Sequence, residues 1–250
     1  MFLFKYRPFD AFTESIIRDK ALFFASPKQL NDPFDCHIIP EVDCTMDEWR
    51  AFCESSVDKF YTGPAQGRQI HLDLLIEKWK KNPAEIRDIL LYSARDAMGV
   101  CCFSRTATNL LMWAHYADSH RGVCLVFRLG QVAYSNDPLV TIEPVRYEEE
   151  YPRINIAHAG IESTLDTMLL TKSKVWAYEQ EWRAFYPGAS TLHPLKTYHL
   201  WGVIMGLGIS NEQKENLIEI AKRERMGLSI ATRNPNAFGI SAEVIRLPEY

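Results

Sequence analysis

The pattern of apolar and polar positions predicts strands at both ends of the chain and helices between them. Short apolar or aromatic runs bounded by turn residues are typical of strands. Such runs predict a central mixed β-sheet built from Leu3–Tyr6, Leu22–Ala25, Val100–Ser104, Gly122–Arg128 and Trp176–Tyr186. Because strands and helices mix without strict alternation, the predicted fold class is α+β, with further helices flanking the sheet.

Residues 45–98 instead follow a helical period. Thr45 and Glu48 form a capping box at the start of one helix. Asn82-Pro83 begins another, because proline suits the first helical position. This stretch carries no recognisable chemistry, so we expect a helical insert or subdomain within a single α+β domain that spans residues 1–250.

Near the C-terminus the pattern predicts a strand, a helix and a second strand. The strands are Trp201–Met205 and Leu228–Thr232, and Ser210 with Gln213 caps the helix between them. A helix joining two strands is the usual parallel crossover, so we expect a β-α-β unit.

Composition excludes several classes of protein. Hydrophobic residues make up 47% of the chain and charged residues 24%, which are ordinary globular values. The net charge of −4 offers no basic footprint, so nucleic-acid binding is not indicated. The longest nearly apolar stretch, Leu200–Ile209, is too short to span a bilayer as a helix. The six cysteines lack zinc-type spacing. We therefore expect a cytoplasmic protein with buried thiols, no metal and no membrane association.

The segment around Glu179-Gln180-Glu181 carries the densest candidate chemistry. On a strand, Glu179, Glu181 and Arg183 would share one face. Neighbouring like charges raise the pKa of one glutamate, whereas Arg183 opposes that shift. Such a row suits acid–base chemistry or ribose recognition. The alternative is a solvated strand face with Tyr178 and Trp182 packed inward.

Three other segments offer polar groups. His115 is the most buried-looking of the seven histidines, either as a hydrogen-bonded core residue or as a catalyst beside Tyr116. The turn Asn31–Asp35 has a structural explanation, since Asn and Asp side chains bond their own backbone. Equally, Asn31, Asp32 or Asp35 could face a ligand. Arg7 could clamp a phosphate or pair with a surface glutamate.

Taken together, these segments resemble a bacterial family of unknown function, number 2971. The resemblance is carried by Leu3–Arg7, Leu22–Pro27, Asn31–Asp35, Cys102–Ser104, Leu111–Ala117, Gly122–Phe127 and Lys172–Arg183. The helical stretch 45–98 falls in the variable region of that family. The family's usual setting implies a role in phage defence or a toxin–antitoxin-type system, with a protein partner from the same operon.

A more distant resemblance is to the ADP-ribosyltransferase fold, whose arginine-type members carry an E-x-E like that of Glu179-Gln180-Glu181. The resemblance implies NAD as substrate. It would place Arg7 on the NAD phosphates or nicotinamide ribose and Glu181 on the ribose 2′-hydroxyl, while Glu179 would orient or deprotonate the acceptor. Ser26, 19 positions after Arg7, is the candidate for the middle element.

We therefore predict that residues distant in sequence converge on one cleft. The candidate catalytic residues are Glu179, Glu181, Arg183 and His115. The candidate cofactor-binding residues are Tyr6, Arg7, Ser26, Asn31, Asp32 and Tyr116.

Two other classes of function remain open. One is a metal-dependent nuclease, with Asp32 or Asp35 and the two glutamates around a divalent ion and Arg183 in place of a lysine. The other is a non-catalytic regulator, with Trp113, Trp176 and Trp182 as core or interface aromatics.

Overall fold

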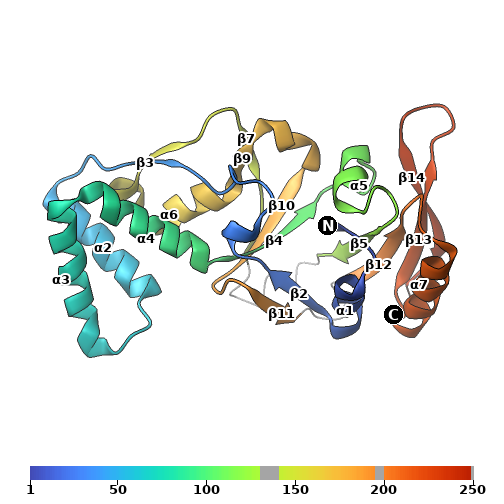
Figure 1. The fold of residues 1–250 in the computed structure, drawn as a ribbon, viewed down its shortest axis with the longest axis horizontal. Helices are drawn as coiled ribbons and strands as arrows, with labels where there is room; N and C mark the ends of the chain where they lie inside the picture. Colours follow the sequence, from blue (N-terminus) through green and yellow to red (C-terminus); the bar gives the residue numbers. More distant parts are fainter. Residues whose placement is uncertain (130–140, 195–199, 249–250) are drawn as a thin grey trace.

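An eight-stranded mixed sheet forms the centre of the molecule in this computed structural model, which describes residues 1–129, 141–194 and 200–248 (Figure 1). Its strand order is β14 (Ile240–Arg246), β13 (Gly227–Arg233), β12 (Leu200–Met205), β5 (Val123–Arg128), β1 (Phe2–Arg7), β4 (Gly99–Ser104), β10 (Glu181–Tyr186), β6 (Thr141–Pro144). The fold class is α+β, as predicted from the sequence.

The predicted β-α-β crossover is present at the C-terminal end of the sheet. Strands β12 and β13 are parallel and are joined by α7 (Asn211–Arg223). Ser210 accepts a hydrogen bond from the Gln213 amide, and the Gln213 side chain returns to the Ser210 backbone. The local capping signal therefore marks the true start of this helix.

The sheet opens between two of its central strands. β1 pairs with β5 along its whole length, but with β4 only where Phe4 faces Ser104. At the other end of β4, Val100 instead forms an isolated bridge with Ala25. This opening lies beside the candidate site.

One strand predicted for the central sheet is elsewhere. β2 (Ala21–Phe24) pairs with β11 (Thr191–Pro194) in a separate two-stranded sheet, so the prediction that Leu22–Ala25 joins the central sheet was wrong. An apolar run identifies a buried strand, but the strand beside it depends on where distant segments pack.

Successive side chains of β1 pack on opposite faces of the sheet. Leu3 packs in the core that includes residues of α1 (Ala11–Asp19) and α7. Phe4 and Tyr6 pack on the other face with Met112 and Trp113 of α5 (Leu110–Tyr116). Because successive strand residues point to opposite faces, Lys5 and Arg7 share the face of Leu3.

The predicted helical insert forms one end of the molecule (Figure 1). It comprises α2 (Met46–Phe60), α3 (Ala65–Lys81) and α4 (Pro83–Ala97), which pack with α6 (Ile156–Leu170) around their own apolar cluster. Thr45 and Asn82 cap α2 and α4 as expected, since each accepts a hydrogen bond from an amide three residues later.

Two short parallel pairs lie outside the central sheet, and the second of them carries residues of the candidate site. They are β3 (Ile39–Glu41) with β8 (Arg153–Asn155), and β7 (Arg146–Glu148) with β9 (Thr171–Ser173). Tyr147 and Lys172 are partners in the second pair. The 3₁₀ helices are η1 (Pro27–Gln29) and η2 (Lys174–Glu179).

The prediction of one continuous strand over Trp176–Tyr186 was wrong for the residues before Glu181. Its first part is η2, and the strand β10 begins only at Glu181. Gln180 between them has a left-handed backbone, with φ of 45°. This residue turns the chain between the helical and the extended segment.

Candidate functional site

The two glutamates of the E-x-E segment are held by different elements. Glu179 ends η2, and its carbonyl accepts a 2.7 Å hydrogen bond from the Ser104 hydroxyl. Glu181 begins β10 opposite Ser104, and its amide donates to the Tyr147 hydroxyl at 2.7 Å. Both side chains are almost completely buried, so the alternative of a solvated strand face was wrong.

A single lysine joins the two carboxylates. Lys172 Nζ lies 2.5 Å from Glu179 Oε2, 2.9 Å from Glu181 Oε2 and 3.7 Å from Asp35 Oδ2. Its side chain is 5% exposed, and the Trp176 ring lies 5.1 Å from the ammonium. Lys172 therefore serves as the central counter-ion of a buried cluster.

Arg183 is the second buried cation of the cluster. Its Nε and Nη2 atoms form a fork on Glu181, at 2.8 and 3.1 Å, and Nη2 also donates to Asp35 Oδ2 at 2.5 Å. Nη1 donates to the Leu169 carbonyl at 2.7 Å and to Cys36 Sγ at 3.3 Å. Because Arg183 is fully buried and fully engaged, it positions Glu181 and does not reach a ligand.

The environments of the two carboxyls move their pKa values in opposite directions. Burial raises the pKa of Glu179, and the Lys172 ammonium and the Tyr116 hydroxyl offset that rise only in part. Burial would also raise the pKa of Glu181, but Arg183 and Lys172 outweigh it and hold that pKa at about 2. Glu179 is therefore the carboxyl whose pKa is raised, but the main cause is burial, and the neighbouring charge of Glu181 that the sequence suggested contributes less.

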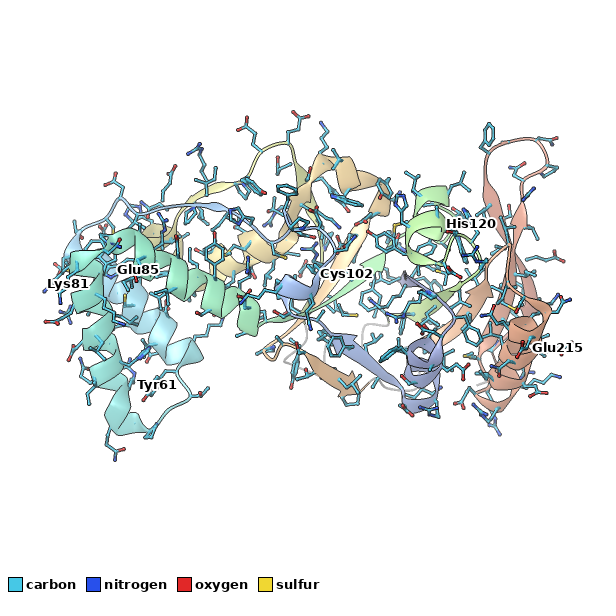
Figure 2. The ribbon with its side chains drawn as sticks, viewed as in Figure 1. Tyr61, Lys81, Glu85, Cys102, His120 and Glu215 are labelled. Carbon is cyan, nitrogen blue, oxygen red and sulfur yellow. The ribbon has the colours of Figure 1, made fainter. Side chains whose placement is uncertain are left out.

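A cavity of about 110 Å³ lies against these carboxylates at the opening between β1 and β4. An apolar cavity of ~150 Å³ accommodates a benzene ring, so this smaller one has room for at most one small ring. Figure 2 labels Cys102, one of its lining residues, near the middle of the molecule. Besides the cluster, the cavity is lined by Phe4, Lys5, Tyr6, Leu30, Asn31, Phe103, Ser104, Met112 and Tyr116.

Tyr116 contacts Glu179 at this cavity, and other polar groups lie around it. The Tyr116 hydroxyl donates to Glu179 Oε1 at 2.6 Å, and Asn31 Nδ2 donates to that hydroxyl at 3.2 Å. Tyr6 directs its hydroxyl to the Thr106 carbonyl. The structure thus brings together Tyr6, Asn31, Tyr116, Glu179 and Glu181, with Arg183 directly behind them.

Arg7 does not join them. Phe4, Ser104 and Glu181 are cross-strand neighbours and share a face, whereas Arg7, three positions after Phe4, points to the other. Its Nε donates to Thr13 Oγ1 of α1 at 3.1 Å. The prediction that Arg7 and Glu181 share one cleft was therefore wrong. The β1 cation at the cavity is Lys5. It starts from the same face as Arg7, but it lies where β1 and β4 separate, and its ammonium donates through the opening to the Cys102 carbonyl at 2.9 Å.

Three other predicted residues lie outside the cavity. Ser26 donates to the Asp96 carbonyl at the end of α4, and Asp32 accepts from the Phe34 amide in a local turn. His115, expected to be buried, is exposed because it lies on the outer side of the short helix α5 and contacts the Tyr178 hydroxyl at 3.1 Å. The turn explanation of Asp32 is thus the one that the structure supports.

The carboxylates do not form a metal site. The Lys172 ammonium already occupies the position between Asp35, Glu179 and Glu181 that a divalent cation would need. Across the described ranges, no group of three or more His, Cys, Asp or Glu side chains could hold a metal ion. The donor set therefore does not fit the metal-dependent nuclease.

Besides Lys5, the site residues that sequence reasoning missed are Lys172 and Tyr147. Both lie in short strands, β9 and β7, that have no periodicity of their own. A lysine is rarely fully buried unless paired, and nothing in the neighbouring sequence reveals the pairing.

Comparison with known proteins gives one partial match. The model of a family described as "Protein of unknown function (DUF2971)" matches residues 112–184. That range contains Tyr116, Lys172, Glu179, Glu181 and Arg183, so most of the charged cluster lies within it. Neither a curated protein nor a solved structure matches the chain. Among the described helices, none is long and apolar enough to cross a membrane.

Proposed function

We propose that the cavity beside Glu179 is the active site of an enzyme that transfers or hydrolyses the ribosyl group of NAD. The observation that carries the proposal is geometric: Glu179 and Glu181 are both buried beside the cavity and share Lys172, but only Glu181 receives Arg183, which displaces their pKa values in opposite directions. Paired titratable groups whose environments separate their pKa values are typical of acid–base assignments in enzymes. Reactions at glycosidic bonds commonly use two such carboxylates.

The proposed roles follow from the two environments. Glu181 stays ionised, so it suits stabilisation of the positive charge that develops on the sugar as the bond to nicotinamide breaks. Glu179 has the raised pKa and therefore the better match to a base that deprotonates the acceptor or water. Lys5 takes the phosphate-binding role expected of Arg7, because it is the β1 cation that lines the cavity.

The surroundings of the carboxylates agree with a sugar-sized substrate group. Phe4, Tyr6 and Met112 provide apolar wall, while Asn31 and Tyr116 provide hydrogen-bonding groups. A buried charged cluster is costly to assemble, and apolar residues of similar volume often give the same stability. Stability alone therefore gives little reason for the cluster of Lys172, Glu179, Glu181 and Arg183, which agrees with a functional role. An NAD-consuming enzyme also fits the phage-defence or toxin–antitoxin setting implied by the family resemblance.

The test is to incubate the protein with NAD labelled in the nicotinamide ring and to measure released nicotinamide. Wild-type protein should release it, and Glu181→Gln should lower kcat by about a hundredfold or more while sparing KM. Glu85→Gln, on α4 at the far end of the insert (Figure 2), is the matched control. A wild-type protein that neither binds nor consumes NAD would replace this proposal with the non-catalytic regulator.

A further inference from the structure

A second and larger cavity lies beside β9. Its volume is about 420 Å³, within the ~300–1,000 Å³ typical of ligand pockets. The loop after η1, the segment between β7 and β8, and β9 itself form its lining. Lys172 lines both cavities, but its ammonium is committed to Glu179 and Glu181.

Aromatic side chains make up much of this lining. Phe34 is 68% exposed, an unusually open position for a phenyl ring at the edge of a cavity. His37 and Tyr151 lie together, with ring centroids 4.8 Å apart and planes at 66°. Burial, with help from Arg95, lowers the pKa of His37 and so disfavours the charged imidazolium. The cavity thus presents uncharged flat rings.

The charged groups that face the cavity are mainly acidic. Glu148, Glu149 and Glu150 all line it and are exposed. Glu149 is paired with Lys174 at 2.7 Å, whereas Glu148 and Glu150 have no ion-pair partner within the part of the chain that the structure describes. Two unpaired carboxylates and exposed rings therefore surround a space of ligand size.

We infer that this cavity binds the arginine side chain of a partner protein. A guanidinium stacks on aromatic faces and donates bidentately to carboxylates, which a compact ammonium cannot do as well. The exposed rings of Phe34 and Tyr151 supply the aromatic surface, and Glu148 and Glu150 supply the acceptors. A bound arginine would also cover the exposed ring of Phe34. This inference is independent of the proposed reaction at Glu179.

The experiment titrates the full chain with three short peptides, acetyl-Gly-Arg-Gly-amide and its citrulline and lysine counterparts. Citrulline keeps the size and planarity of arginine but has no charge. Binding is followed by chemical-shift changes in the amide spectrum. We expect the arginine peptide to bind about tenfold more tightly than either counterpart, with affinity falling as salt increases.

Two variants locate the site. Phe34→Ala and the double variant Glu148→Gln/Glu150→Gln should each remove the preference for arginine over citrulline. Glu215→Gln/Glu219→Gln makes the same charge change on α7, at the end of the molecule opposite the helical insert, and should retain the preference (Figure 2). All these positions are exposed, so the variants should keep the wild-type melting temperature.

Three results of these titrations would contradict the inference or the assignment to arginine. Equal binding of the arginine and citrulline peptides would overturn the inference, as would an undiminished preference in the Glu148/Glu150 variant. Equal binding of the lysine peptide would overturn the assignment to a guanidinium. None of these results depends on NAD turnover, so failure of this inference would leave the proposed function untouched.

Discussion

Glu179 and Glu181 share one ammonium group, yet their pKa values move in opposite directions. Lys172 Nζ lies 2.5 Å from one carboxylate and 2.9 Å from the other. The difference arises because Glu181 also receives the guanidinium fork of Arg183, whereas Glu179 receives only the neutral hydroxyl of Tyr116. One additional cation therefore decides which carboxyl is held ionised.

Replacing the shared lysine should destabilise the protein strongly. Lys172→Met keeps much of the side-chain volume but leaves buried carboxylates without their counter-ion, which should cost about 3–5 kcal/mol. Urea denaturation measures the loss. Lys174→Met, two residues away, removes an exposed pair with Glu149 and should cost at most about 1 kcal/mol. Equal losses in the two variants would contradict the central role of Lys172.

Tyr116→Phe should raise the pKa of Glu179 further. The hydroxyl donates to Glu179 Oε1 and so favours the ionised carboxylate. Its loss should also cost about 1 kcal/mol of folding stability. An NMR titration with ¹³C-labelled glutamate measures the pKa. In the control Tyr178→Phe, a hydroxyl that contacts His115 is lost, and the Glu179 titration should stay where it is.

Acid should remove the stability that Glu181 supplies. Its folded-state pKa of about 2 lies below the ordinary value of 4.5, so its contribution is present above pH 4.5 and is lost as pH falls towards 2. The raised pKa of Glu179 acts in the opposite sense, because its contribution is present at low pH and lost as pH rises. The difference in unfolding free energy between wild type and Glu181→Gln should thus narrow from pH 4.5 to 2. A constant difference would show that Arg183 and Lys172 do not depress this pKa.

Arg7→Ala should leave ligand binding at the cavity intact. Arg7 bonds Thr13 on the opposite face, so its loss should cost about 1 kcal/mol of stability. Under the proposed function, Lys5→Ala on the same strand should instead weaken NAD binding in a calorimetric titration. Weaker NAD binding in Arg7→Ala, with no effect in Lys5→Ala, would reverse the assignment.

Part of the candidate site could be predicted because strands alternate. Glu181 and Arg183 are two positions apart on β10 and do share a face. The same rule separates Tyr6 from Arg7, which are adjacent on β1 and point to opposite faces. Alternation alone does not exclude Arg7, because Lys5 shares its face and still lines the cavity; the bond of Arg7 to Thr13 is a tertiary contact. The prediction also placed Glu179 on the face of Glu181, but Glu179 precedes the strand. The left-handed backbone of Gln180 separates the two segments, and no local sequence pattern predicts it.

The sequence by itself determined the local elements. Thr45, Asn82 and Ser210 mark true helix starts because a cap bonds an amide only three residues away. Only the tertiary structure decided which strands are neighbours, such as the pairing of β2 with β11. It also decided that Lys172, Asp35 and Glu181 are buried together. The energy of such a cluster depends on distances between segments far apart in the chain and on the exclusion of water, and neither is encoded in a local pattern.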